Sequence, residues 1–319
     1  MSPKVDFPLA PDMRSEDAVR IILRFLLEVI RINEARLAED RDSEFLHDYR
    51  VAIRRTRSAL RQMKQVFPAG ITGRFKKDFS HVGKLSNELR DLDVHLQNEG
   101  IYRAMLPSAQ RDDIGPLFAY LREKRAKVFR EFLPHLETSR YKKIMHDWNL
   151  FLNTPVQDYS SSPNAELPVR ELAKKRIYKK YKRISNKQKA INKNMADDML
   201  HLLRIKCKEL RYLLEFFSPL FPREKIRGLI GQLKKLQDIL GEYNDFRVQQ
   251  QRLKDLAGEI PVTDSRSKKT VAAIGSLVEA MEREKGKAKR AIAKTFSAYA
   301  SPQKQKVYRE LFGAGSSFL

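Results

Sequence analysis

The stretch that decides the fold is His47-Asp48-Tyr49-Arg50-Val51-Ala52-Ile53-Arg54-Arg55-Thr56-Arg57, and it returns as His201-Leu202-Leu203-Arg204-Ile205-Lys206-Cys207-Lys208-Glu209-Leu210-Arg211. At about 100° per residue, a helix would place one basic stripe on a single face of each copy. The stripe residues are His47, Arg50, Arg54 and Arg57 in the first copy and His201, Arg204, Lys208 and Arg211 in the second. Apolar residues occupy the opposite side of the second copy, namely Leu203, Leu210, Leu213, Leu214 and Phe217. Each copy is therefore predicted to be a helix with one buried face and one cationic stripe.

The two copies lie 154 residues apart, and the same offset holds well beyond them. It relates Leu60 to Leu214, Phe67-Pro68 to Phe221-Pro222, Glu88 to Glu242, Asp91 to Asp245 and Val94 to Val248. Short solenoid repeats have periods of about 20–50 residues, so this repeat is of a different kind. It predicts duplication of a domain-sized unit and a molecule with approximate two-fold symmetry. The two stripes would then be related parts of one site.

Composition points to an ordered, helical protein that binds an anion. The chain has 319 residues, 42% of them hydrophobic, which is an ordinary value for a globular protein. Its net charge of +23 exceeds what solubility requires, and the sign predicts an anionic partner. Glycine and proline are scarce and cluster between long periodic segments, so the fold class is predicted to be all-α.

Other features of the sequence narrow the class further. Cys207 is the single cysteine, and its neighbours place it within a helix, so a core thiol is expected rather than a nucleophile. No segment approaches the roughly 18 apolar residues of a membrane span, and the first residues lack the shape of a signal peptide. A cytoplasmic protein without a membrane partner is expected.

The chain divides near its middle. Residues 1–13 hold three prolines and are predicted to form an extended tail, and residues 154–168, rich in proline and serine, are predicted to be a linker. Residues 14–153 and 169–319 would each form a helical bundle. Long helices are expected at about 14–40, 43–67, 74–98 and 114–133, with a shorter helix around 141–153. In the second half, after a dense basic run at 174–183, long helices are expected at about 196–218, 224–256 and 267–300. Four long helices per half predict two four-helix bundles packed together.

The stripes are not typical of a solvated helix surface. Such surfaces usually alternate charge signs at i,i+4 and gain about 0.2–0.5 kcal/mol per pair. Here Arg50 and Arg54 form a like-charged i,i+4 pair, as do Arg204 and Lys208, so binding of something negative is indicated. The first stripe would be about 15 Å long, which is too long for one phosphate. Because a glycine-rich phosphate loop is absent from the sequence, side chains in a groove or channel would hold a linear polyanion.

Four motifs in order make the chain similar to a known family. They are Leu46-His47-Asp48-Tyr49-Arg50-Val51-Ala52-Ile53-Arg54-Arg55, Leu89-Arg90-Asp91-Leu92-Asp93-Val94, His201-Leu202-Leu203-Arg204-Ile205-Lys206 with Leu210-Arg211-Tyr212, and Leu240-Gly241-Glu242-Tyr243-Asn244-Asp245. From about residue 14 to 315 the sequence resembles the CHAD family, the conserved histidine α-helical domain. The resemblance implies two four-helix bundles related by pseudo-two-fold symmetry, with a basic central channel that binds inorganic polyphosphate.

The resemblance also implies a set of ligand contacts. By motif position these are His47, Arg50, Arg54, Arg57, His201, Arg204, Lys208 and Arg211. Basic residues on other helices, where the motifs are looser, are further candidates: Arg20, Arg24, Arg122, Arg125, Lys174 and Arg283. Many relatives carry a fused triphosphate tunnel enzyme of the CYTH type, whose Glu-x-Glu-x-Lys strand pattern is absent from this sequence. A non-enzymatic protein without cofactor is therefore expected, in the cytoplasm and in association with polyphosphate granules.

The residues also bear on metal binding, phosphoryl chemistry and pH dependence. A metal at His47 or His201 is disfavoured, because cationic neighbours repel it and no two histidines stand at i,i+4. The repeated acids Glu88, Asp91, Glu242 and Asp245 could hold Mg²⁺, but a structural role is favoured, either as ion pairs that orient the stripe arginines or as helix caps. With so many cations nearby, an empty-site histidine should be neutral near pH 7, and bound phosphate would favour its protonated form. Affinity would then rise as the pH falls from about 8 to about 6.

Nucleic-acid binding is the main alternative, because charge alone does not separate RNA, DNA and polyphosphate. Tyr178 and Tyr181 stand between lysines and could stack on bases, although packing against their own bundle is favoured. No helix-turn-helix or zinc-finger pattern is visible. A purely structural interaction protein would not explain two stripes in register. The prediction is non-enzymatic polyphosphate binding, and the oligomeric state and the preferred chain length stay open.

Overall fold

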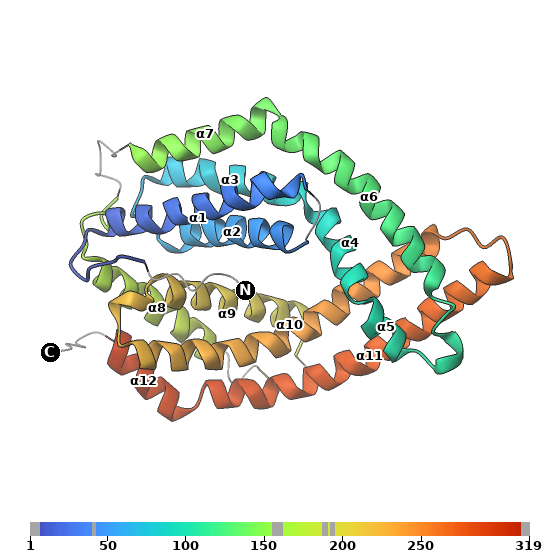
Figure 1. Ribbon diagram of the computed structural model, residues 1–319. Coiled ribbons are helices and arrows are strands. Elements are labelled where there is room, and N and C mark those ends of the chain that lie inside the picture. The colour runs from blue at the N-terminus through green and yellow to red at the C-terminus, as the bar shows by residue number, and fades with distance from the viewer. Residues whose placement is uncertain (1–6, 40–42, 155–161, 187–190, 192–194, 314–319) are drawn as a thin grey trace.

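The computed structural model describes residues 7–39, 43–154, 162–186, 191 and 195–313 (Figure 1). This part of the chain is helical throughout, with one isolated β-bridge between Arg14 and Pro168 and no strand, so the all-α prediction is confirmed. The α-helices are α1 (Ser15–Leu37), α2 (Ser43–Gln62), α3 (Ala69–Leu85), α4 (Asn87–Gln97), α5 (Glu99–Met105), α6 (Gly115–Glu137), α7 (Ser139–Asn153), α8 (Val169–Ser185), α9 (Asp197–Phe216), α10 (Arg223–Glu259), α11 (Ser265–Tyr299) and α12 (Pro302–Phe312). No helix among these residues is long and apolar enough to cross a bilayer.

The predicted repeat offset reappears in the helix bounds. Helices α1, α2 and α3 begin 154 residues before α8, α9 and α10, and α2 and α9 also end at that offset. Pro68, Pro168 and Pro222 directly precede the first residues of α3, α8 and α10. Because proline lacks an N–H and has φ fixed near the helical value, it suits the start of a helix, where no acceptor is available for that N–H.

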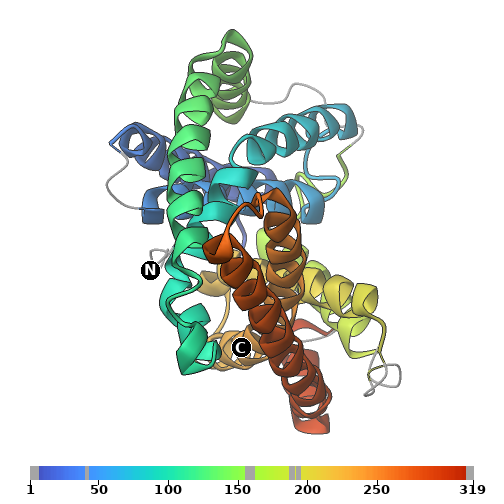
Figure 2. The ribbon, with the colours of Figure 1, turned by 90° about the vertical axis from the view of Figure 1, so that its right-hand side faces the viewer.

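The helices form two layers that meet along α2 and α9. In Figure 1, α1, α2, α3 and α7 lie above, and α8, α9, α12 and the long antiparallel pair α10–α11 lie below. Helices α4, α5 and α6 descend from the upper layer and reach the far end of the α10–α11 pair, and Figure 2 shows α6 running beside it. Helix α11 contacts both α5 and α6 there.

Both hydrophobic cores draw residues from both halves of the sequence. The larger core includes Ile22, Leu26, Phe79, Trp148, Leu172, Leu210, Leu236, Phe296 and Tyr308. The smaller core includes Leu92, Tyr102, Phe118, Leu121, Leu253, Ile274 and Leu277. The two halves therefore share both cores, although most of the contacts between helices lie within a half. The buried side chains also include Cys207, so the expectation of a core thiol is confirmed, and burial raises the pKa of that thiol.

The segment before α1, predicted as an extended tail, packs onto the helices from Phe7 onward. Phe7 is 6% exposed, and its ring lies 5.5 Å from a phenylalanine ring of α1 in an edge-on contact. The end of the predicted linker packs beside it, where the backbone N–H of Ser15 donates to the carbonyl of Leu167 at 2.9 Å. Residues 1–6 and 155–161 lie outside the described residues.

Reciprocal ion pairs join α2 to α9. Arg55 of α2 pairs with Glu215 of α9, and Arg61 Nη1 lies 3.2 Å from Glu209 Oε1. At the offset of 154, Arg55 corresponds to Glu209 and Arg61 to Glu215. The position of Arg55 in one copy thus contacts the position of Arg61 in the other, and the reverse contact is also made. This reciprocal pattern is that of an interface on a two-fold axis. The pattern supports the predicted pseudo-two-fold relation, with the charge sign changed between the copies.

Removal of Glu209 is expected to weaken this interface. Its carboxylate is 11% exposed and accepts from Arg61 at 3.2 Å and from Lys180 at 2.6 Å. We expect Glu209→Ala to lower the free energy of unfolding by about 2 kcal/mol, because it leaves two cations unpaired near the core. Urea denaturation measures this, with Glu224→Ala in an exposed ion pair as the control, expected to lose less than about 0.5 kcal/mol. Equal losses would show that the interface pair is no stronger than a surface pair.

Candidate functional site

The two stripes meet where α2 packs against α9. Arg54 is exposed, and the other seven stripe residues are half-buried. The charge of Arg54 acts on Arg204 and Lys208, so stripe residues from both halves of the sequence lie within electrostatic reach of one another. We call Arg50, Arg54, Arg204, Lys208 and Arg211 the central cluster.

Lys208 occupies the most strongly perturbed position of this cluster. Burial lowers its pKa to about 7, with further lowering by the charges of Arg204, Arg54 and Arg211, and Asp245 opposes the change. An ordinary lysine has a pKa near 10.4. A titratable group shifted this far by burial and by like charges is typical of a site that binds or transforms a charged ligand.

A break between two helices holds Arg50 in place. Its Nη1 donates to the Ser86 hydroxyl at 2.7 Å and to the Gly83 carbonyl at 3.2 Å, and Nη2 donates to Asn87 Oδ1 at 2.9 Å. Ser86 is the residue between α3 and α4, so the prediction of one continuous helix over 74–98 is wrong. The break allows a guanidinium to dock on the helix end. Burial lowers the pKa of Arg50 to about 10.

No such helix break lies beside the second stripe, because α10 continues through the position equivalent to Ser86. The residues of this stripe bond to side chains of α10 instead. Arg204 Nη2 donates to Asp245 Oδ1 at 3.3 Å, and His201 Nδ1 lies 2.9 Å from Asn244 Oδ1. In the first half, the position equivalent to Asn244 is Arg90, whose charge helps burial to lower the pKa of His47. This lowered pKa of His47 agrees with the expectation that a stripe histidine is neutral when no ligand is bound.

Two of the eight predicted contact residues, Arg57 and Arg211, have guanidinium groups that turn partly away from Lys208 and toward other partners. Arg57 Nη2 donates to the Ser80 hydroxyl of α3 at 3.3 Å, so its guanidinium lies over α3. Arg211 Nε lies 3.3 Å from a carboxylate oxygen of Glu215, although the charge of Arg211 still acts on Lys208. The remaining six lie along α2 and α9. Arg50 has partners on α3 and α4, Arg54 donates to Tyr212 of α9, and His201 and Arg204 have partners on α10.

Two further arginines join the site and were not predicted. Arg90 of α4 acts electrostatically on His47, Arg50 and Asp91, and its Nη1 is buried without an acceptor among the described residues. Arg252 of α10 acts on Asp91 as well. Arg90 could have been found, because it stands inside the Leu89-Arg90-Asp91 motif. No pattern in the sequence marks Arg252, which only the packing of α10 brings to this place.

Unpartnered buried donors are a second property of the site. Nε of Arg204 and Nη1 of Arg90 are both buried and lack a hydrogen-bond acceptor within the described part of the chain. A buried donor without a partner is unfavourable by about 1–3 kcal/mol. Natural proteins usually satisfy such groups, and these two belong to cations at one site, so the arrangement suits an anionic acceptor.

The repeated acids hold arginines and form no metal-binding group. Asp245 accepts from Arg204, Glu88 Oε1 lies 3.8 Å from Arg252, and the charge of Asp91 acts on Arg50. Burial raises the pKa of Asp91, as expected for a half-buried carboxylate. No group of three or more metal-binding side chains occurs among the residues that the structure describes. These three acids behave as the orienting ion pairs that were favoured from the sequence.

Two of the looser candidates brace the fold. Arg20 is buried, lies 2.8 Å from Glu16 and stacks over the rings of Phe67 and Phe151. Arg24 donates to the carbonyl of Leu152 at 2.6 and 3.1 Å. Both arginines thus tie α1 to the end of α7.

The other four looser candidates lie on α6, α8 and α11. Three of them have carboxylate partners within the chain: Arg122 pairs with Glu99, Arg125 with Asp93 at 3.0 Å, and Lys174 with Glu171 at 3.0 Å. Arg283 is exposed on α11. The first three are engaged in ion pairs. In the central cluster Arg204 and Arg211 also have carboxylate partners, but the charges of Arg54, Arg204 and Arg211 all act on Lys208 as well.

The two tyrosines that could stack on bases pack into the fold. Tyr181 is 3% exposed and stacks on Tyr308, with ring centroids 3.7 Å apart. Tyr178 packs against the larger core. The preferred interpretation, packing against their own bundle, is confirmed.

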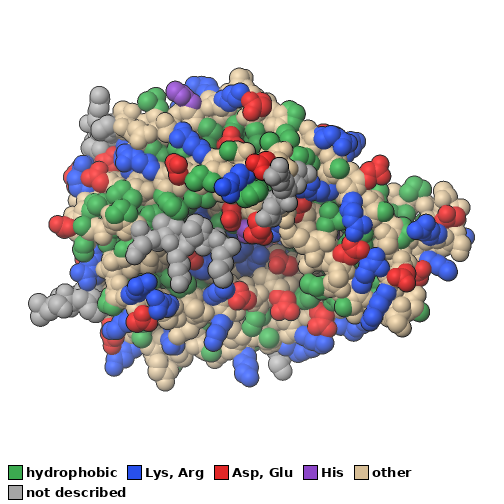
Figure 3. Space-filling model, in the orientation of Figure 1, with side chains coloured by type: hydrophobic (Ala, Val, Ile, Leu, Met, Phe, Trp, Pro, Cys, Tyr) green, Lys and Arg blue, Asp and Glu red, His purple; other side chains and the backbone are tan. Residues whose placement is uncertain are grey.

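A hollow lies on the face of the molecule that Figure 3 shows, between the upper and lower layers of helices. Lys, Arg and His side chains are visible at its bottom, and acidic side chains lie along its rim. A channel through the molecule stays a prediction from the sequence.

The chain is similar to one family and to solved structures of that fold. The family model described as "CHAD domain" matches residues 21–254, which is more than half of the chain. A crystal structure of the CHAD domain from the plant Ricinus communis is 25% identical, covers 91% of this chain and 94% of its own, and has a TM-score of 0.75. PptA from Streptomyces chartreusis is 15% identical, covers 89% of this chain and 100% of its own, and has a TM-score of 0.65, which shows the fold alone. No curated protein matches the sequence.

Proposed function

The chain belongs to the CHAD domain family, and from this premise we propose that it binds inorganic polyphosphate at the central cluster without transforming it. The observation that carries the proposal is Lys208, a half-buried lysine surrounded by Arg54, Arg204 and Arg211. Like charges at this density destabilise the ligand-free protein, and a bound polyanion would relieve the repulsion.

The distribution of the cations favours a linear ligand over a single phosphate. They come from α2, α4, α9 and α10, and the stripe from His47 to Arg57 alone spans about 15 Å of α2. Side chains hold the ligand in this proposal, since arginine forks match phosphate oxygens and Lys208 adds a compact charge. Binding without catalysis is proposed because the repeated acids near the cluster are engaged with Arg204, Arg252 and Arg50. Association with polyphosphate granules would follow from the same affinity.

Nucleic acid is the second candidate, because its backbone phosphates would meet the same cations. The aromatic residue nearest the cluster, Tyr212, is 2% exposed and accepts from Arg54 Nε at 3.0 Å. A base needs an exposed aromatic face to stack on, and neither Tyr212 nor Tyr181 offers one. Nucleic acid would therefore be held by its phosphates alone. Polyphosphate presents more charge per length than a single nucleic-acid strand, because no sugar separates its phosphates.

Competition binding tests the proposal. Labelled long-chain polyphosphate is titrated with the protein over a salt series and competed with single-stranded and duplex DNA at equal phosphate concentration. We expect polyphosphate to bind more tightly than either DNA at physiological ionic strength, with log K falling linearly with log salt concentration. Equal competition per phosphate by DNA would replace this proposal with a general polyanion surface, and absence of binding would refute both.

A further inference from the structure

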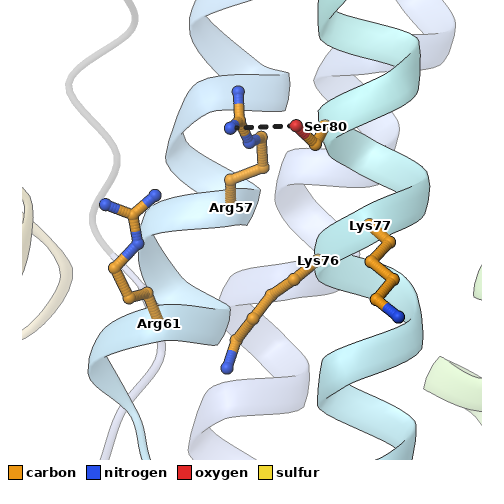
Figure 4. Close-up of a pocket in the computed structure, with 5 residues that line it drawn as sticks. All are labelled: Arg57, Arg61, Lys76, Lys77 and Ser80. Atoms are coloured by element: carbon orange, nitrogen blue, oxygen red, sulfur yellow. Dashed lines mark hydrogen bonds between the residues drawn. The ribbon is translucent and has the colours of Figure 1, made fainter.

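A pocket of about 250 Å³ opens between α2 and α3, beside the end of the first stripe (Figure 4). Arg57 and Arg61 line it from α2, and Lys76, Lys77 and Ser80 line it from α3. In Figure 4 the side chain of Lys76 extends from α3 into the space between the two helices. Arg57 belongs both to the first stripe and to the pocket. It follows Arg54 by less than one helical turn, and its guanidinium donates to Ser80, which lines the pocket.

The pocket carries unneutralised positive charge. Among the described residues, neither Arg57, Lys76 nor Lys77 has a carboxylate within ion-pair distance, and Arg61 alone is paired, with Glu209 at 3.2 Å. Burial lowers the pKa of Lys76, with further lowering by the charges of Lys64 and Arg61. Cations that repel one another around an open volume suit an anion, and the Ser80 hydroxyl adds a neutral donor.

The second half carries less positive charge at the equivalent positions. At the offset of 154, the counterparts of Arg61, Lys76 and Lys77 are Glu215, Ile230 and Gly231, and Lys234 replaces Ser80. Arg211, the counterpart of Arg57, lies 3.3 Å from Glu215, a carboxylate that also pairs with Arg55. The basic surface that leaves the central cluster is therefore more strongly charged on the α2 side, and the two halves differ in charge here.

We propose that the pocket between α2 and α3 binds the segment of a polyphosphate chain that extends beyond the central cluster, and so directs long chains over the first half of the protein. The proposal rests on polyphosphate binding at the central cluster and adds Arg61, Lys76, Lys77 and Ser80 to the contacts. A short oligophosphate would occupy the central cluster without reaching the pocket. The pocket thus makes the protein selective for longer chains.

The test compares two ligand lengths in one variant. For Lys76→Ala/Lys77→Ala we expect the affinity for long-chain polyphosphate to fall about tenfold at low salt, with a salt slope smaller by about 1–2, because two phosphate contacts are lost. The affinity for tripolyphosphate should change by less than about twofold, because the central cluster is intact. Ser80→Asp, which sets a carboxylate against Arg57, should act in the same direction.

The matched control is Lys268→Ala/Lys269→Ala, which removes two adjacent exposed lysines from the start of α11. Circular dichroism confirms that each variant is folded. Equal losses in the two lysine variants, or an equal loss for tripolyphosphate and long chains in Lys76→Ala/Lys77→Ala, would overturn the pocket as a continuation site. Failure of the wild type to bind either phosphate ligand would instead refute the proposed function, so the two failures are distinguishable.

Discussion

Replacing Arg54 and Lys208 together by alanine is expected to weaken binding of long-chain polyphosphate by about 100-fold or more. The two side chains come from different halves of the sequence, and Arg54 lowers the pKa of Lys208, so they act on one small volume. A hydrogen bond to a charged group contributes about 1.5–3 kcal/mol, and loss of two such bonds corresponds to at least about 100-fold in the dissociation constant.

Fluorescence titration of labelled polyphosphate at constant salt measures this effect. The matched control is Lys127→Ala/Arg130→Ala, which removes the same two residue types from exposed positions on α6. We expect that control to remain within about threefold of the wild type, because exposed distant charges are screened over a Debye length of about 10 Å. Comparable losses in both variants would mean that the ligand responds to the net charge and not to the central cluster.

Raising the pH from about 7 to about 9 is expected to weaken polyphosphate binding, by up to about tenfold per pH unit, through Lys208. In the ligand-free protein the pKa of Lys208 is about 7, so above this pH the side chain is largely neutral. Bound phosphate favours the charged form, and binding therefore takes up a proton in this range. The charge of a long polyphosphate chain changes little there, because each interior phosphate has a single, strongly acidic ionisation and only the two terminal groups have a second one.

The same group has the opposite effect on the stability of the ligand-free protein. In the unfolded chain Lys208 stays protonated up to about pH 10.4, so between about pH 7 and pH 10 the unfolded state binds one proton more. Its contribution to the free energy of unfolding therefore rises with pH in this window, by about 1–2 kcal/mol after allowance for partial exposure. Below pH 7 both states carry the charge, and this dependence ends.

Lys208→Met keeps the alkyl chain and removes the charge, so it isolates both effects. Affinity and unfolding free energy are measured for wild type and variant at a series of pH values, and the difference between the two proteins is taken. We expect the variant to bind more weakly and to be more stable than the wild type near pH 7. The affinities should converge above about pH 9 and the unfolding free energies above about pH 10. Parallel profiles would show that Lys208 does not titrate in this range.

The group that makes binding depend on pH could not be identified from a local sequence pattern. From the sequence, the histidines of the stripes were expected to respond to pH, with affinity rising as the pH falls. For His47 the neutral ligand-free state agrees with the structure, since burial and Arg90 lower its pKa. Lys208 was predicted only as a contact. Its pKa depends on charges from both α2 and α9, and their distances are set by packing.

The sequence by itself determined most of the long helices and the two cationic stripes, but not the break between α3 and α4 or the helices α5, α8 and α12. Hydrophobic periodicity and proline positions act within a few residues, so α2 and α9 could be placed without knowing their neighbours. The fixed offset of 154 residues between Arg50 and Arg204 also pointed to related positions in both halves. For the same reason the all-α class was predictable.

Only the tertiary structure decided which cations share the site. Arg20 and Arg24 look as basic as Arg54 in the sequence, yet they meet Glu16 and a carbonyl of Leu152 and brace α1. Arg252, which no motif marks, reaches the site because α10 places it beside α4, 3.8 Å from Glu88. Helical periodicity fixes the face on which a charge lies. Which residues that charge then meets depends on how segments about 150 residues apart in the sequence pack around the shared cores. No local sequence pattern contains that information.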